Sequence, residues 1–189
     1  MSLYVKVKRN FLIWNYRMIS SRQVHIEGHP ILKQPLLVNG EGRIEFGQDV
    51  SLGFEYAQNY HNAYIYMDLR GSDSMIRIGD GVMLNNNASL IADEASIHIG
   101  KNAVAGVNLS IQTSDGHCLN PNIRHTGYFP KYSVTIGENV FIGDNVTILK
   151  GVNIGKNTVI GAGSVVTGII PENVMAAGNP CKVIHPLSY

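Results

Sequence analysis

The sequence predicts an all-β protein whose chain winds into a parallel β-helix. Over residues 134–166 an aliphatic residue returns at every sixth position, and a small or branched residue stands two positions before each one. Positions i and i−2 share one face of a strand. Gly and Asn, which tolerate positive φ, lie between these pairs and turn the chain at little cost. The recurring aliphatic residues are Ile136, Ile142, Ile148, Ile154, Ile160 and Val166.

An α-helix cannot use this period. Six residues rotate a helical side chain by about 600°, so successive aliphatic residues would face different directions. Three units of strand and turn instead complete one triangular coil, and stacked coils bury the aliphatic positions inside a prism. Hexapeptide periods are a known signature of such solenoids. An ordinary antiparallel sheet with frequent turns is the alternative interpretation.

The same period extends upstream, with interruptions. In-phase pairs begin at Ile44 and Phe46, and three extra residues lie between Leu90 and Ile99. Longer irregular pieces occupy residues 53–75 and 112–135. Insertions in a solenoid become loops on one face, which is often the binding face. We therefore expect the chemistry of the protein in these two pieces.

Both ends of a solenoid need a cap, because an open end exposes backbone edges and core. The length fits one domain. We expect an N-terminal helix or cap over residues 1–23, a β-helix catalytic domain over 24–170 and a C-terminal covering segment over 171–189. The N-terminal segment could pack on the coil or contact a membrane surface. Its bases are Lys6, Lys8, Arg9, Arg17 and Arg22.

Composition excludes several classes of function. The net charge of +1 gives no electrostatic basis for binding nucleic acid. No apolar run is long enough to span a membrane, and the apolar stretch 11–14 is too short for a signal peptide. Two cysteines do not form a disulfide scaffold. We expect a cytoplasmic protein, at the inner face of the membrane if its N-terminus contacts lipid.

The longer insertion contains "TSDGHCLNP", which places His117 directly after a glycine. Histidine is the most common general base near neutral pH, because its reference pKa is about 6.5. His117 is therefore the candidate base, although an ordinary loop histidine is the simpler interpretation. The other insertion is rich in aromatic residues that suit either sugar faces or packing. These are Tyr56, Tyr60, Tyr64 and Tyr66, with His61 among them.

Residues 116–184 resemble the hexapeptide-repeat acyltransferases, the left-handed β-helix family that includes galactoside, maltose and serine acetyltransferases. Three stretches carry the resemblance: "SDGH", the repeat "VTIGENVFIGDNVTILKGVNIGKNTVIGAGSVVTGIIPENV", and "AAGNPCKVI". The chain is most similar to galactoside, maltose and polysaccharide O-acetyltransferases. The resemblance implies acetyl transfer from acetyl-CoA to a sugar or glycan hydroxyl, such as that of a cell-surface polysaccharide precursor. It also implies a homotrimer with active sites between subunits, and no metal.

The resemblance assigns roles to individual residues. His117 matches the base that takes the proton from the acceptor hydroxyl in a direct transfer, a role typically worth about 10²–10⁴ in rate. The backbone N–H of Asp144 matches the donor to the developing oxyanion. Acceptor binding is expected of Asn85 and Asp115, and the aromatic insertion adds Tyr64 as a further candidate. The residues expected to bind the cofactor are Phe141, Gly143, Ala162, Thr167 and Lys182.

Two positions depart from the family pattern. Phe141 stands where the family often has tryptophan, which keeps apolar packing and removes an indole N–H. Gly168 stands where the family often has lysine after threonine, so one cation for the cofactor phosphates is missing. We expect either a lower affinity for the cofactor or a replacement cation from Lys182, Lys150 or a neighbouring chain.

Other readings stay open at the level of sequence. One is N-acetylation of an aminosugar nucleotide, and another is a non-catalytic β-helix scaffold. A zinc enzyme of the γ-carbonic anhydrase type would need three histidines that converge between subunits, and the candidates are His98, His117 and His125. Cys118 next to the base is a candidate covalent nucleophile, although a neighbouring side chain usually points elsewhere.

Overall fold

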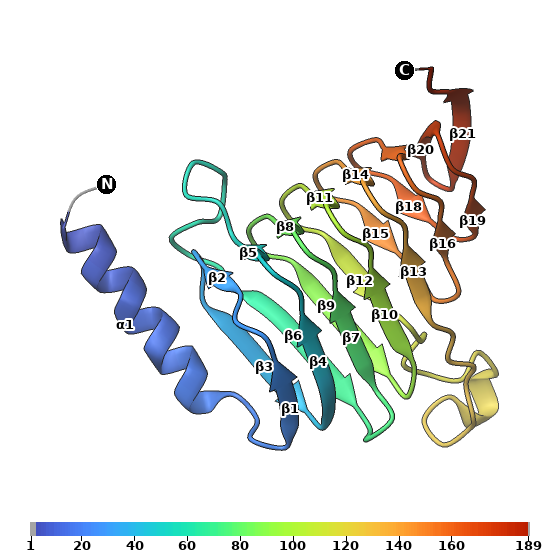
Figure 1. The fold of residues 1–189 in the computed structure, drawn as a ribbon. Helices are drawn as coiled ribbons and strands as arrows, with labels where there is room; N and C mark the ends of the chain where they lie inside the picture. The colour runs from blue at the N-terminus through green and yellow to red at the C-terminus, as the bar shows by residue number, and fades with distance from the viewer. Residues whose placement is uncertain (1–2, 189) are drawn as a thin grey trace.

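A computed structural model of the protein describes residues 3–188, and it shows a three-sided prism of stacked coils with a helix at one end (Figure 1). Three sheets form the faces of the prism, and their neighbouring strands run parallel except for the last pair, β20 and β21. The predicted parallel β-helix is therefore confirmed.

We name the sheets by the order in which the chain enters them. The first sheet contains β1 (Val24–Glu27), β4 (Gly42–Phe46), β7 (Met75–Ile78), β10 (Ser96–Ile99), β13 (Val134–Ile136), β16 (Asn153–Ile154) and β19 (Ile169–Ile170). The second contains β2 (Ile31–Leu32), β5 (Ser51–Leu52), β8 (Met83–Leu84), β11 (Val104–Ala105), β14 (Phe141–Ile142), β17 (Val159–Ile160), β20 (Val174–Gly178) and β21 (Cys181–Pro186). The third contains β3 (Leu36–Gly40), β6 (Ile65–Arg70), β9 (Ser89–Asp93), β12 (Ser110–Gln112), β15 (Thr147–Ile148) and β18 (Val165–Val166).

The aliphatic positions of successive coils stack in register inside the prism. Ile136 pairs with Ile154, which pairs in turn with Ile170. On β13 the two inward residues are buried while Thr135 between them is exposed. Burial of apolar surface is the main favourable term in folding, so these ladders hold the coils together and leave only the corners free to vary.

Asparagines turn the chain between the first and second sheets. Asn139, Asn157 and Asn173 all have φ between 55° and 57°, a conformation that asparagine tolerates better than most residues. Their side chains form a ladder along this corner: Asn139 donates to Asn157 at 3.1 Å, and Asn157 donates to Asn173 at 2.9 Å. The predicted turn role of asparagine is confirmed at these positions.

The coil extends further than the in-phase pairs indicated. Strands β1 to β3 precede Ile44, and β6 lies inside the piece that the sequence left irregular. In β6 the inward residues Ile65, Met67 and Leu69 are fully buried and alternate with the other face, where Asp68 accepts a hydrogen bond from Arg70 at 2.8 Å. Downstream, β20 continues the second sheet and β21 runs antiparallel to it, so the segment predicted as a cover also supplies a coil strand.

Helix α1 (Leu3–Ile19) packs at the N-terminal end of the prism, beside β3 (Figure 1). The connection is fixed by two serines: Ser20 Oγ accepts from the N–H of Val38 at 3.0 Å, and Ser21 Oγ donates to the carbonyl of Gly40 at 2.6 Å. A helix was predicted in this segment, and packing on the coil is what the structure shows; residues 1 and 2 lie outside the described part. No helix within residues 3–188 has the length and apolarity needed to cross a membrane.

Replacing Ile136 by alanine should lower the free energy of unfolding by about 2–5 kcal/mol, because the fully buried side chain leaves a cavity in the ladder. The neighbouring Thr135→Ala on the outer face should change it by no more than about 0.5 kcal/mol. Urea unfolding at one fixed protein concentration measures both. Equal losses in the two variants would contradict the inward and outward assignment on β13.

Candidate functional site

The loop that carries His117 leaves the prism at the corner between the third and first sheets. It runs from the end of β12 to the start of β13 and includes a short 3₁₀ turn, η1 (Pro121–Ile123). His117 is exposed, and its ring lies 5.5 Å from the ring of His125 in an edge-to-face arrangement. The candidate base is therefore accessible to a substrate at this corner.

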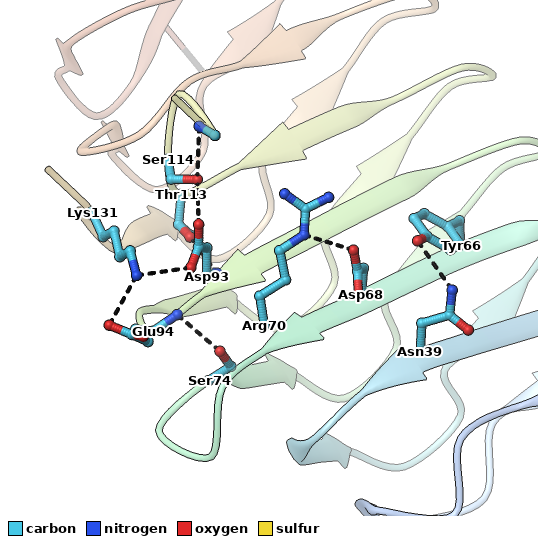
Figure 2. Close-up of polar contacts among 11 residues, drawn as sticks. Asn39, Tyr66, Asp68, Arg70, Ser74, Asp93, Glu94, Thr113, Ser114 and Lys131 are labelled. Atoms are coloured by element: carbon cyan, nitrogen blue, oxygen red, sulfur yellow. Dashed lines mark hydrogen bonds and ion pairs between the residues drawn. The ribbon is translucent and has the colours of Figure 1, made fainter. Parts of the chain in front are cut away.

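A buried carboxylate holds both ends of this loop (Figure 2). Asp93, at the end of β9, is only 5% exposed. Ser114 at the start of the loop donates its hydroxyl to Asp93 at 2.8 Å, and the Lys131 ammonium at the loop's end lies 3.1 Å from the same carboxylate. Lys131 also pairs with Glu94 at 2.9 Å. Because the backbones of Ser114 and Lys131 form an antiparallel bridge, the loop closes at its base.

The two carboxylates beside Lys131 favour its protonated, positively charged form. The hydrogen bond to Glu94, followed by that to Asp93, raises the pKa of this ammonium above its usual 10.5. A raised folded-state pKa stabilises the fold below the unfolded value, and that stabilisation is lost as pH rises through the folded value. Lys131 therefore carries its positive charge at neutral pH, and raising the pH through its elevated pKa would remove the cation from the clamp.

Sequence reasoning missed Asp93 and Lys131. The available signal was the break of three extra residues between Leu90 and Ile99, which contains Asp93 and lies at the same corner as the long insertion. A carboxylate in one break and a lysine at the end of the next are brought together by stacking of adjacent coils, although 38 positions separate them.

Several predicted residues gather at the corner of His117. Asp115, two positions before His117, pairs with the ammonium of Lys150, which follows β15 one coil further along. Thr167 follows β18 at the same corner in the next coil. The ammonium of Lys150 is therefore paired with Asp115, close in sequence to the candidate base.

A second group of predicted residues lines a groove of about 450 Å³ on the second sheet. The floor is a row of outward-facing apolar side chains that pair in register from strand to strand. Phe141 in this row is half exposed, which is unusual for a large aromatic side chain. The row consists of Met83, Val104, Phe141, Val159 and Met175, and the predicted site residues in the groove are Asn85, Phe141, Gly143, Asp144 and Ala162.

Asn85 differs from its two neighbours in the run of three asparagines. Asn86 is fully buried, and its amide donates to the carbonyls of Phe54 and Gln58. Asn87 has a φ of 61° and occupies a turn. Asn85 lines the groove, and its side-chain oxygen accepts from the N–H of Asn86 at 2.8 Å.

The two remaining predicted residues lie elsewhere. Lys182 is exposed on β21, where it pairs with Ala177 at the C-terminal edge of the second sheet. Tyr64 precedes β6, and its ring lies 4.9 Å from that of Tyr16 on α1 and 6.4 Å from that of Tyr66. These contacts agree with the packing interpretation of the tyrosine cluster, and the acceptor role of Tyr64 stays a prediction.

Within one chain the groove and His117 lie on opposite sides of the prism. In a three-sided prism the second face is opposite the corner that joins the third face to the first. The structure thus brings five predicted residues together in the groove and three at the loop corner, and one chain alone does not join the two groups.

No metal-binding group emerges from the described residues, since no three His, Cys, Asp or Glu side chains gather there in a suitable way. His98 lies on β10 of the first sheet, whereas His117 and His125 lie in the corner loop. Cys118 is a free thiol whose backbone N–H donates to the carbonyl of Arg124 at 3.2 Å.

The coils stack into three sheets of mainly parallel strands, with in-phase aliphatic ladders inside and an exposed histidine on a corner loop. These features define a hexapeptide-repeat β-helix. Comparison with known proteins agrees: residues 133–168 match the family "Bacterial transferase hexapeptide (six repeats)". Over this segment the chain is similar to the hexapeptide-repeat transferases, and its fold is the left-handed parallel β-helix that the family resemblance predicted.

Individual relatives are sugar acetyltransferases by name. The galactoside O-acetyltransferase of Escherichia coli K12 is 42% identical over 115 residues, which are 61% of this chain and 56% of that enzyme. A solved maltose O-acetyltransferase from Clostridium difficile 630 has 25% identity and a TM-score of 0.52, covering 98% of this chain and 86% of the other.

A mutant of AntD, an N-acyltransferase from Bacillus cereus solved with dTDP and coenzyme A, has a TM-score of 0.65 at 16% identity. That alignment covers 93% of this chain and 89% of the other, and it shows a shared fold. The chain spans 51–58% of the length of the curated relatives that it matches.

Replacing Lys131 by methionine should loosen the loop over residues 114–131, because the buried carboxylate of Asp93 then loses its cationic partner. We expect amide hydrogen exchange in this loop to rise at least tenfold, with β13 unaffected. Lys101→Met removes a cation from an exposed pair with Glu138 and should change nothing measurable, since exposed pairs contribute little. Unchanged exchange in Lys131→Met would show that the carboxylate does not hold the loop.

Proposed function

We propose that the protein transfers an acetyl group from acetyl-CoA to a hydroxyl of a sugar or glycan. The main support is that three predicted cofactor residues, Phe141, Gly143 and Ala162, lie together along one groove with an apolar floor. The relatives named above act on galactosides and maltose according to their names. The proposal includes a cytoplasmic location, because the two cysteines are free and a reducing compartment keeps thiols in that state.

The groove suits the elongated, partly apolar arm of coenzyme A. Ligand sites are typically apolar slots with a few placed polar groups, and here turn backbones border an apolar row. Gly143 lets its turn stack closely on the next coil, because a Cβ at that position would come within 2.6 Å of the backbone nitrogen of Ala162. Lys182 is the proposed cation for the phosphates, since Lys150 is engaged with Asp115. Thr167 would contact the cofactor from the loop corner.

The proposed site is shared between two chains of a homotrimer. A cyclic assembly can place the loop corner of one chain over the second sheet of the next, and the same contact then repeats around the ring. Each chain would contribute His117 to one site and its groove to another. This arrangement explains how residues on opposite sides of one prism act together.

His117 would act as general base and then as general acid. The acceptor hydroxyl gives its proton to the imidazole as its oxygen bonds to the acetyl carbonyl carbon. The backbone N–H of Asp144 would donate to the carbonyl oxygen as negative charge develops there. The carbon–sulfur bond then breaks, and the imidazole returns the proton to the thiolate, so that the acetyl ester and free coenzyme A are the products. Asn85 and Asp115 are the proposed acceptor-binding groups, with Tyr64 at greater distance.

Replacing His117 by alanine should reduce the rate of thiol release from acetyl-CoA by about 10²–10⁴, the usual worth of a positioned base. The assay uses a panel of sugar hydroxyl acceptors and aminosugar nucleotides. His98→Ala on the first sheet is the matched control and should retain the rate. Undiminished activity in His117→Ala would reject the base, and turnover of amino acceptors alone would favour N-acetylation.

Replacing Ala162 by tryptophan should raise the KM for acetyl-CoA at least tenfold, because an exposed side chain at this turn would fill the groove. The thermal midpoint should change little, since the side chain of Ala162 is exposed. Asn62→Trp, also exposed but outside the groove, serves as the control for the added indole. An unchanged KM in Ala162→Trp would remove the cofactor from this groove.

A further inference from the structure

Helix α1 carries an apolar stripe on its outer side. Val7, Phe11, Trp14 and Met18 follow the spacing i, i+4, i+7, i+11, which places them along one face of a helix. Each is between 54% and 60% exposed. The rings of Phe11 and Trp14 stack with centroids 6.4 Å apart. The stripe is thus continuous and uncovered within the chain.

The opposite face of α1 is the one that docks on the prism. Ile13 and Ser20 line a cavity of about 360 Å³ together with residues of the first coils, and Arg17 borders the same cavity at the edge of this face. Tyr16 packs against Tyr64, and Arg9 lies 3.5 Å from the hydroxyl of Tyr60. Because these residues fix which side of the helix faces the coil, the exposed apolar stripe lies on the side away from it.

Basic residues flank the stripe on both sides. At about 100° per residue, Lys8 lies on one side of it and Lys6 and Arg17 on the other, and all three are exposed. Residues 3–22 contain no Asp or Glu, whereas the whole chain has 14 acidic residues against 15 basic ones. The positive charge of the protein is therefore concentrated around an exposed apolar face.

We propose that α1 binds the surface of a bilayer rich in anionic lipid and lies in the plane of the interface. Amphipathic helices with aromatic and aliphatic residues on one face and bases beside them bind in this way. The stripe would enter the boundary of the acyl chains, while the lysine and arginine stems reach back to the headgroups. This inference uses only α1 and does not depend on the proposed acetyl transfer.

Charge argues against a second copy of the helix as the occupant. Two α1 helices packed through their stripes would bring Lys8 of one close to the flanking bases of the other. No acidic side chain within residues 3–22 would offset that repulsion. An anionic lipid surface satisfies both the apolar stripe and its basic flanks.

Trp14 provides a direct reporter, because it is the only tryptophan in the sequence. The protein is mixed with vesicles of phosphatidylcholine containing about one-third phosphatidylglycerol, or with phosphatidylcholine alone. We expect a blue shift of tryptophan emission and co-flotation with the anionic vesicles, both weakened by salt. Neutral vesicles should bind at least tenfold less protein.

Two sets of variants separate the apolar and electrostatic contributions. The triple change Lys6→Gln, Lys8→Gln and Arg17→Gln should lower the partition coefficient about 100-fold, since each base near an anionic surface contributes about fivefold. The double change Phe11→Ser and Met18→Ser should lower the partition coefficient at least tenfold at both low and high salt. Ile169→Ser on β19 removes an apolar side chain that is even more exposed, at 78%, and should bind like the unaltered protein. Lys101→Gln with Lys156→Gln is the charge control.

Circular dichroism checks that each variant keeps its fold, and activity on a soluble acceptor should be retained in all of them. Absence of vesicle binding by the unaltered protein, or equal binding to neutral vesicles, would overturn the proposal. So would Trp14 emission that is already blue-shifted and shielded from iodide without lipid, together with a smaller assembly in Phe11→Ser/Met18→Ser by light scattering. That result would assign the stripe to a contact between copies.

Discussion

The structure depends on register between stacked coils. Each inward aliphatic residue sits over its counterpart in the coil before it, as Ile97 does over Ile76, and a shift by one residue would turn the buried set outward. The interior therefore accepts no extra residues. Any insertion must leave at a corner, and the corner is fixed by the sheet that the chain has just left. The loop of His117 is placed in this way, between the third and first sheets.

This placement has a consequence for the chemistry. The apolar row around Phe141 runs along the second sheet, and the loop corner lies across the prism from it. A rigid solenoid cannot bend to bring these parts together, so the site that we propose requires two copies of the chain. A loop that presents His117 to the groove of a neighbouring chain must keep a defined conformation. The clamp of Asp93 on Ser114 and Lys131 supplies that rigidity from within the chain.

The sequence predicted what its local patterns encode. The ladder from Ile136 to Val166, the asparagine turns and the corner position of His117 follow from spacing alone, while the members of the groove followed from the family resemblance. Strand β6 was missed because the preceding insertion displaces its inward residues, Ile65, Met67 and Leu69, from the hexapeptide phase, although they alternate as a strand requires. The clamp was missed because the contact between Asp93 and Lys131 is created by stacking, which no local pattern records. For α1 the sequence predicted a helix with several bases. Which of its faces is exposed could not be predicted, because that depends on which residues contact the coil.

Subunit mixing tests the shared site most directly. His117→Ala protein keeps an intact groove, and Ala162→Trp protein keeps an intact loop, so each assembly alone should be nearly inactive at low acetyl-CoA. When equal amounts are dissociated and reassembled together, about one interface in four receives the intact loop of one chain and the intact groove of the other. We predict recovery of about a quarter of the unaltered activity at the same acetyl-CoA concentration. A mixture no more active than its two components would contradict a site built from two chains.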